Sequence, residues 1–244
     1  MAGKNRQVVE GEWLGKIAAE EGFSDGGAAI WGDPKNAHAK EKHPNPNLLC
    51  EHVELFIPEK KPKVVPRAAA AKHRFVAARA KTVLRIQIVD MDGNPRENEP
   101  YRLLVGLVEF RGKTFAGPGH SDATGTWGPG MIRHEIPVAS TRGSIELTNT
   151  GEVLDFKVGM LREIDPGHKN ILCVIKAAQA RLNNLGFGCG SVDGISGKKT
   201  KAAIHAFQAF CKEHKAKLGF DSGTADGILG PITRAALKRA HGEL

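Results

Sequence analysis

The side chains that could do chemistry are few, and the first candidates are His120, Asp122 and His134. Histidine and carboxylate ligands could hold a zinc ion that activates water for hydrolysis. Their spacing matches no metallopeptidase pattern, and Asp122 followed by Gly125 is also typical of a turn. We therefore expect no metal site among these residues.

A catalytic nucleophile is not indicated either. The sequence contains no G-x-S-x-G pattern, and Cys189 lies between two glycines without an obvious partner base. The two carboxylates of a glycosidase can be far apart in the chain, so glycan hydrolysis stays open as an alternative. The prediction is a protein that is not an enzyme and that needs no cofactor and no metal.

One short pattern occurs twice near the C-terminus. The spacing D-G-I-x-G-x-x-T covers residues 193–200 and again residues 226–233. Asp-Gly accepts a positive φ angle at low cost, so each copy is predicted to be a tight turn that leads into a helix. Calcium is a possible ligand of acidic loops, but it needs six or more oxygens and each copy offers one carboxylate. Turn formation is the expected role of both aspartates.

Helices are predicted on both sides of these loops. Apolar residues recur at three- and four-residue spacing over 171–185 and over 198–214. Gly186 is a predicted C-cap, and Pro231 stands where the first turn of a further helix tolerates proline. The C-terminal part of the chain, 167–244, is therefore expected to be a three-helix domain.

These residues resemble the three-helix peptidoglycan-binding domain that is found beside many cell-wall hydrolases. The similarity rests on Gln179-x-x-Leu182-x-x-Leu185-Gly186-Phe187, on the first loop, and on Ala203-Ile204-x-x-Phe207-Gln208. It implies a shallow ligand-binding region framed by these candidate residues: Asp193, Gly194, Gly197, Thr200, Gln208, Asp226, Gly227, Gly230 and Thr233. The segment 211–222 departs from the family because it is longer and more basic than usual.

The N-terminal part is predicted to fold as strand, helix, second helical or irregular stretch, and strand. Residues 6–9 are extended, residues 13–21 are amphipathic, and Gly22 ends that helix. Residues 53–57 alternate apolar and polar side chains until Pro58.

This pattern resembles the lysin motif, or LysM, a βααβ module that binds glycans containing N-acetylglucosamine. The similarity rests on the opening Val8-x-x-Gly11-Glu12-Trp13-Leu14 and on the closing Asn45-Pro46-Asn47-Leu48. It implies glycan contacts from Gly11, Glu12, Trp13, Asn45 and Asn47. Glu12 and Trp13 replace the usual Asp-Thr pair, and an indole at position 13 could either stack on a sugar or fill a small core.

The middle of the chain, 82–166, changes to a period of two. Strands are expected at 83–89, 101–105, 132–138, 144–147 and 154–156, separated by turn residues. A small antiparallel β-sandwich is the natural packing. Its turns resemble those of transthyretin-like or carboxypeptidase-regulatory-like sandwiches, which serve as spacers.

Positive charge is concentrated in two segments of a chain whose formal net charge is +8. Residues 58–81 carry eight basic and one acidic side chain, and residues 167–244 carry twelve and five. An anionic polymer is therefore the expected partner of the C-terminal domain. Nucleic acid, bound through the 58–81 linker, is a less favoured alternative.

Four cysteines, at positions 50, 173, 189 and 211, show no zinc-ligand spacing and are expected mainly as buried thiols. One disulfide among the three C-terminal ones is an alternative if the protein meets an oxidising compartment. The polar start lacks the apolar segment of a secretory signal, and no run of apolar residues is long enough for a membrane span. We expect synthesis in the cytoplasm and action at the cell wall or periplasm after non-classical delivery.

Together these patterns predict an α+β multidomain protein. Its expected parts are a LysM-like domain (1–57), a basic Pro/Ala-rich linker (58–81), a β-sandwich spacer (82–166) and a peptidoglycan-binding domain (167–244). The predicted function is non-catalytic attachment, of the protein or of an associated assembly, to bacterial cell wall. A second hypothesis is a structural or adaptor component of a phage-tail-like contractile injection or type VI secretion apparatus, with its tail-like or secretion proteins as partners. A third is a cell-wall hydrolase.

Overall fold

The structure is a computed structural model that describes residues 3–60, 80–122, 125–165 and 170–242 and the single positions 66, 69, 71 and 72. Most of the predicted basic linker, 58–81, lies outside the described residues. The chain forms two compact units. Unit 1 consists of Met1–Leu14, Ala28–Glu59 and Gly159–Leu244, and unit 2 of Gly15–Gly27 and Lys60–Val158.

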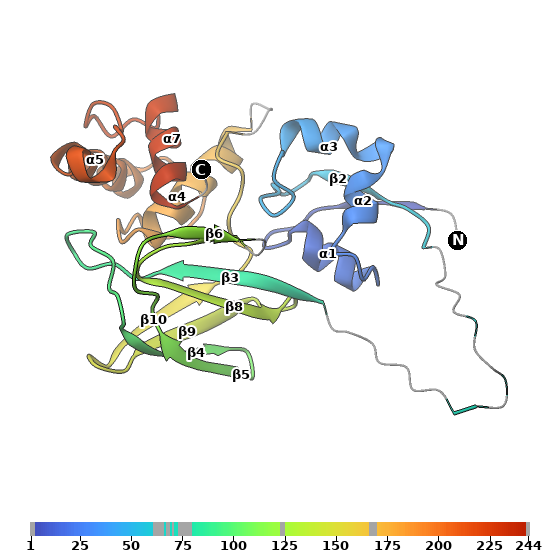
Figure 1. The fold of residues 1–244 in the computed structure, drawn as a ribbon. Helices are drawn as coiled ribbons and strands as arrows, with labels where there is room; N and C mark the ends of the chain where they lie inside the picture. The colour runs from blue at the N-terminus through green and yellow to red at the C-terminus, as the bar shows by residue number, and fades with distance from the viewer. Residues whose placement is uncertain are drawn as a thin grey trace. The chain divides into compact units, whose positions relative to one another are not determined.

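The N-terminal part of unit 1 is built on a two-stranded antiparallel sheet (Figure 1). Its strands are β1 (Lys4–Gln7) and β2 (Glu54–Ile57). Between them in the chain come the helices α1 (Leu14–Glu20), α2 (Ala28–Gly32), η1 (Pro34–Asn36) and α3 (Ala37–Lys42). Of these helices, α1 belongs to unit 2 from residue 15 onward. The predicted order of strand, helices and strand is therefore present, with β1 beginning two residues earlier than position 6.

Asn36 fastens the helical stretch to β2. Its buried side-chain amide donates to the carbonyl oxygens of Ile30 (2.7 Å) and Phe56 (2.8 Å), and its oxygen accepts the Phe56 N–H (2.7 Å). A buried amide whose groups are all paired stabilises one arrangement of the neighbouring backbone.

The C-terminal part of unit 1 is helical. The helices are α4 (Ile171–Asn184), α5 (Lys198–Glu213), α6 (Lys215–Leu218) and α7 (Pro231–Ala240). Asn170 caps α4 by accepting the Cys173 N–H at 3.2 Å, and Pro231 begins α7 as predicted. Apolar side chains of the three longer helices share a core of Ile164, Ala177, Ala178, Leu182, Cys189, Ala203, Ile204, Phe207, Cys211, Ala236 and Leu237.

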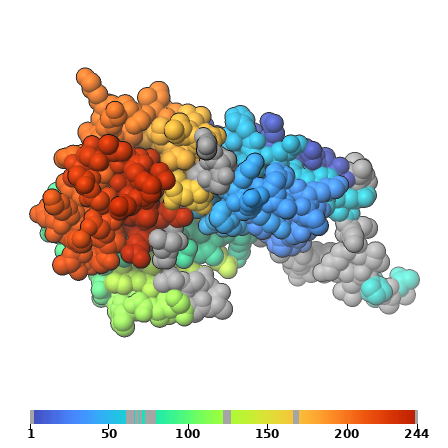
Figure 2. All heavy atoms as spheres, turned by 90° about the horizontal axis from the view of Figure 1, so that it is seen from above, coloured from blue at the N-terminus to red at the C-terminus, as the bar shows by residue number. Residues whose placement is uncertain are grey.

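In the space-filling view, the orange to red atoms of these helices form one continuous mass (Figure 2). The helices predicted at 171–185 and 198–214 are confirmed to within one residue. The short helix α6 was not predicted, and it accounts for part of the unusually long segment 211–222. The predicted separate domains 1–57 and 167–244 do not correspond to these units. Residues 1–14, 28–57 and 167–244 belong to unit 1, whereas residues 15–27 belong to unit 2.

Unit 2 contains antiparallel sheets. The four-stranded sheet has the order β10 (Glu152–Lys157), β9 (Arg142–Leu147), β4 (Pro100–Val105) and β5 (Val108–Lys113). Two-stranded sheets are formed by β3 (Lys81–Gln87) with β8 (Met131–Pro137) and by β6 (His120–Asp122) with β7 (Gly125–Trp127).

One core joins the four-stranded sheet to the β3–β8 pair. It is made of Ile88, Tyr101, Leu103, Val105, Ile132, Ile136, Ile145 and Leu147. The five predicted strands are present, but β5, β6 and β7 were missed. Strand β5 lies at a sheet edge with most of its side chains in solvent, so its sequence has little of the apolar alternation that marks a buried strand.

The described residues thus make an α+β protein with antiparallel sheets, as predicted. Among the described helices, none is both long and apolar enough to cross a membrane.

Candidate functional site

The first repeated loop is organised by one buried amide, that of Gln179 on α4. Its Nε2 donates to Asp193 Oδ1 (2.8 Å), Thr200 Oγ1 (3.1 Å) and the carbonyl oxygen of residue 195 (3.2 Å). Its Oε1 accepts the Gly194 N–H at 2.8 Å. Asp193 Oδ1 also accepts the Ile195 N–H at 2.8 Å. The loop is therefore held from inside before any ligand arrives.

The second loop repeats this arrangement around Gln208 on α5. The Gln208 Nε2 donates to Thr233 Oγ1 (3.0 Å), Asp226 Oδ1 (3.2 Å) and the carbonyl oxygen of residue 228 (3.1 Å). Its Oε1 accepts two backbone donors, the N–H groups of Asp226 (3.1 Å) and Gly227 (2.9 Å). Thr200, Gln208 and Thr233, predicted as ligand-binding residues, are buried within these networks.

The structural repeat is longer than the pattern recognised from sequence. Leu185-Gly186-Phe187 returns 33 residues later as Leu218-Gly219-Phe220, the same offset as from Asp193 to Asp226. Both Gly186 and Gly219 have positive φ angles, of 85° and 71°. This constant offset is a sequence signal that extends the repeat back to Leu185, but it does not include the two glutamines, which are 29 residues apart.

Two further residues of this longer repeat support the loops. The Cys189 thiol donates to the Gln179 carbonyl at 3.4 Å, and the hydroxyl of its counterpart, Ser222, donates to the Gln208 carbonyl at 3.2 Å. Gln179 precedes Asp193 by 14 residues, but Gln208 precedes Asp226 by 18. The extra length in the second copy contains α6.

Hydrogen bonding and burial shift the pKa values of the two loop aspartates and of the two free cysteines. Hydrogen bonding from Gln179 lowers the pKa of Asp193, and hydrogen bonding from the Ile228 N–H lowers the pKa of Asp226. Both loops therefore present a carboxylate at neutral pH. Burial raises the pKa of Cys189, and it raises the pKa of Cys211 to about 11. Both thiols stay protonated and buried, as expected, and offer no thiolate nucleophile.

A shallow pocket of about 380 Å³ opens beside the first loop. Its lining residues are Cys189, Gly190, Ser191, Asp193, Ile195, Gly197, Lys198, Lys199 and Thr200. Ser191, Asp193, Lys198 and Lys199 are exposed, and the Ile195 side chain is 64% exposed. The pocket thus combines a hydroxyl, a carboxylate, two ammonium groups and an apolar side chain around a preformed turn. Such a set can bind a polymer that carries hydroxyls, amides and carboxylates.

Two predicted glycines, Gly197 and Gly230, lie at equivalent places. Each is the N-cap residue of the following helix, α5 or α7, in extended conformation and without a side-chain cap. They begin the helices, and Gly197 also lines the pocket.

The N-terminal candidates are divided between buried and exposed positions. Glu12 is buried and accepts hydrogen bonds from Arg6 (2.6 Å) and the Val9 N–H (3.0 Å). Trp13 is only 5% exposed and packs against Gly159, with Gly11 beside it. Of the two interpretations left open for Trp13, the structure therefore shows core packing.

Asn45 and Asn47 are exposed and lie together, because Asn45 Oδ1 accepts the Asn47 N–H at 2.9 Å. Asn45 lines a second open pocket, of about 400 Å³, with Pro44, Pro46, Leu48, Glu163 and Lys238. At its base Lys238 Nζ lies 3.3 Å from Glu163 Oε1. This pocket does not include residues of the repeated loops.

The two histidines considered for metal binding have separate aromatic surroundings. His134 Nε2 lies 2.7 Å from the Tyr101 hydroxyl, and its ring stacks on Phe110. His120 packs beside Trp127. Within the part of the chain that the structure describes, no group of three His, Cys, Asp or Glu residues is placed to hold a metal ion.

Comparison with known proteins supports one of the three resemblances, that to the peptidoglycan-binding domain. Residues 174–212 match the family model described as a putative peptidoglycan binding domain. The match spans most of α4, the first loop and nearly all of α5, and it stops before the second loop. No curated protein and no solved structure matches the chain. The region that carries the first loop and its pocket is thus similar to peptidoglycan-binding domains.

Proposed function

We propose that the protein attaches to peptidoglycan through the exposed surface of the first repeated loop and does not cleave it. The observation that carries this proposal is the preformed pocket at residues 189–200, inside the segment that matches the peptidoglycan-binding family. The internal hydrogen bonds of Gln179 hold the loop, so little ordering entropy is lost when a ligand binds.

The chemistry of the pocket suits this polymer. Peptidoglycan offers hydroxyls and amides along its sugars and carboxylates on its stem peptides. Lys198 and Lys199 can pair with carboxylates, while Ser191 and Asp193 can exchange hydrogen bonds with hydroxyls and amides. The exposed Ile195 can cover an apolar face of the ligand. The positive charge of residues 167–244 favours the approach of an anionic polymer.

A disulfide between Cys50 and Cys173 supports action outside the reducing cytosol. Disulfides form and persist in oxidising compartments such as the periplasm and the cell exterior. This pairing joins the two parts of unit 1, so the predicted alternative, a bond among the three C-terminal cysteines, is wrong. We place the protein at the wall of a bacterial cell.

The test is sedimentation of the full chain with purified, insoluble peptidoglycan. We expect the wild type to sediment at low salt and the variant K198A/K199A to bind about twofold to fivefold more weakly, since each exposed ionic contact contributes modestly. The matched control is K113A/K157A, which removes the same charge from exposed positions of unit 2. Retention of the wild type in the supernatant, or an equal loss in the control, would contradict the proposal.

The non-catalytic part of the proposal has its own measurement. Purified full-length protein incubated with a peptidoglycan suspension should leave its turbidity unchanged and release no soluble muropeptides. A steady loss of turbidity would show that the protein is a hydrolase.

A further inference from the structure

One segment of unit 1, residues 159–165, lies between its N-terminal part and its helices, and we call it the strap. Gly159 packs against Trp13, and the Glu163 N–H donates to the Leu48 carbonyl at 3.0 Å. On its other side the buried Arg181 of α4 donates to the Arg162 carbonyl at 2.9 Å. The strap is therefore bound to both parts.

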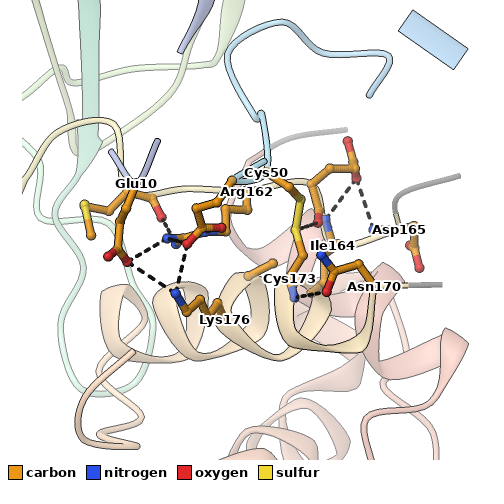
Figure 3. The surroundings of a disulfide bond; sticks show 12 residues. Glu10, Cys50, Arg162, Ile164, Asp165, Asn170, Cys173 and Lys176 are labelled. Carbon is orange, nitrogen blue, oxygen red and sulfur yellow. Dashed lines mark hydrogen bonds and ion pairs between the residues drawn. A yellow bond between two sulfur atoms is a disulfide. The ribbon is translucent and has the colours of Figure 1, made fainter. Parts of the chain in front are cut away.

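An ionic cluster centred on the buried Arg162 reinforces this junction (Figure 3). Arg162, whose side chain is 3% exposed, donates to both carboxylate oxygens of Glu51 (2.7 and 2.8 Å) and to Glu10 (2.8 Å). Lys176 of α4 lies 2.9 Å from Glu51. Burial works against the charge of Glu51, but hydrogen bonds from Arg162 and Lys176 outweigh it and lower its pKa to about 2.

The Cys50–Cys173 disulfide closes the same junction covalently. Cys173 stands in the first turn of α4, where its N–H is capped by Asn170 (Figure 3). Its neighbour Leu172 contacts Gly194, at the centre of the first repeated loop. One helical turn thus carries both the disulfide and the side chain that supports the candidate ligand-binding loop.

We propose that the Cys50–Cys173 disulfide is a redox-sensitive clasp that holds the first loop in its binding conformation through Leu172. This inference rests on the proposed function for its effect on wall binding, but the ordering of the loop can be tested separately. The second loop is supported differently, by α5 at Lys201 and His205, and α5 carries no disulfide. It should therefore be insensitive to the clasp.

The redox step is an ordinary thiol–disulfide exchange. Two molecules of a thiol reductant donate two electrons and two protons, so that the Cys50–Cys173 bond breaks into two thiols and the reductant becomes a disulfide. Oxidation by a disulfide reverses the reaction. Cys189 and Cys211 stay reduced in both states, because they are buried thiols.

The experiment compares wild type with C50S/C173S, each with and without dithiothreitol. Thiol titration of unfolded, unreduced wild type should give two thiols per chain, and four after reduction. Amide exchange of the folded protein should become about tenfold faster at residues 193–195 on reduction, the change that a modest increase in local opening produces. Exchange at 226–228 is the internal reference and should stay constant.

The double variant is the matched control, since it retains Cys189 and Cys211. Reductant should change peptidoglycan sedimentation of the wild type and leave that of C50S/C173S unaltered. Four thiols in the unreduced wild type, unchanged exchange at 193–195, or equal acceleration at both loops would overturn the clasp. Absence of peptidoglycan binding in both redox states would instead refute the proposed function. The amide-exchange rates at 193–195 would still test whether the disulfide holds the first loop.

Discussion

The two repeated loops share a backbone design and differ in what they show to solvent. Each is organised by one buried glutamine, Gln179 or Gln208, and each exposes an isoleucine to the same extent, 64%. At the equivalent positions that follow, the first copy has Lys198 and Lys199 where the second has Pro231 and Ile232. The hydrogen bonds determine the shape of the loop, and two side chains determine the chemistry of its surface.

Their support differs as well. The first loop rests on Leu172, in the turn of α4 that is held by the disulfide and the ionic cluster. The second rests on backbone atoms of α5 at Lys201. The atoms closest to Gly194 belong to the end of the Leu172 side chain, with the Leu172 carbonyl oxygen farther away, whereas those closest to Gly227 are backbone atoms. A side chain added at Gly194 should therefore be accommodated more easily than one added at Gly227.

The largest loss of stability should come from replacing the two buried glutamines that organise the loops, Gln179 and Gln208. Each substitution by leucine strands one buried backbone donor, the Gly194 N–H for Gln179→Leu and the Gly227 N–H for Gln208→Leu. The Asp226 N–H is not stranded, because it also donates to the Thr224 carbonyl at 3.0 Å. Each variant should therefore lose about 2–3 kcal/mol of unfolding free energy. Denaturant unfolding followed by helical circular dichroism measures both, with the exposed Lys212→Ala as control. A loss no greater than that of the Lys212→Ala control would show that the glutamine does not hold its loop.

Breaking the ionic cluster should come next and should act on the first loop alone. Glu51→Gln leaves the buried Arg162 with Glu10 as its carboxylate partner. The loss should be about 2–3 kcal/mol, below the full value for a buried pair because Glu10 is half exposed. Amide exchange should rise at 193–195 and not at 226–228. Equal changes at both loops would show that α4 does not transmit the loss.

The pH dependence of that difference follows from the lowered pKa of Glu51. A depressed pKa stabilises the folded state fully above the ordinary value of 4.5, and this stabilisation is lost as pH falls toward the folded value of about 2. The stability gap between wild type and Glu51→Gln should therefore be constant from pH 7 to about pH 5 and shrink below it. Denaturant unfolding at several pH values measures the gap, and a gap that widens with acid would refute the assignment.

Alanine at the two loop glycines should have a smaller effect on the free energy of unfolding. The effect should differ between the two loops, because different atoms lie beside each glycine. Gly194 and Gly227 both have positive φ, which costs a side-chain-bearing residue about 1–2 kcal/mol. A methyl group on Gly194 would meet the Leu172 side chain, whose end can move, and would lie 3.3 Å from the Leu172 carbonyl oxygen. A methyl group on Gly227 would lie closer to a backbone atom, 3.0 Å from the Lys201 carbonyl oxygen. Gly227→Ala should therefore be the more destabilising by about 1 kcal/mol in thermal or denaturant unfolding. Equal losses of unfolding free energy in the two variants would mean that the positive φ angle alone, and not the neighbouring atoms, determines the cost.

The smallest effect concerns the exposed surfaces. K198A/K199A should weaken peptidoglycan binding in a way that high salt masks, because the lost contacts are ionic. Ile232→Ala in the second copy should change binding by less than about twofold and independently of salt, since a single exposed apolar contact is small. Sedimentation at low and high salt compares them. A dominant effect of Ile232→Ala would move the binding surface to the second loop.

Most of the secondary structure of this protein follows from its sequence. The spacing of apolar residues marked α4 and α5 because each buries one stripe in a common core, and proline marked the start of α7. The edge strand β5 and the short helix α6 could not be predicted from the sequence, because neither buries a periodic apolar face. The repeated Asp-Gly loops were visible because their turns need glycine at positive φ wherever they occur.

Both loops, the helices beside them and the likeness of the first loop region to peptidoglycan-binding domains could thus be predicted from the amino-acid sequence. The roles of Gln179 and Gln208, the burial of Trp13 and the pairing of Cys50 with Cys173 became visible only in the folded protein. These features depend on residues that are far apart in the chain. Periodicity and turn chemistry report on neighbours a few residues apart, whereas a bond across 123 residues depends on how separate elements pack, and no local pattern encodes it.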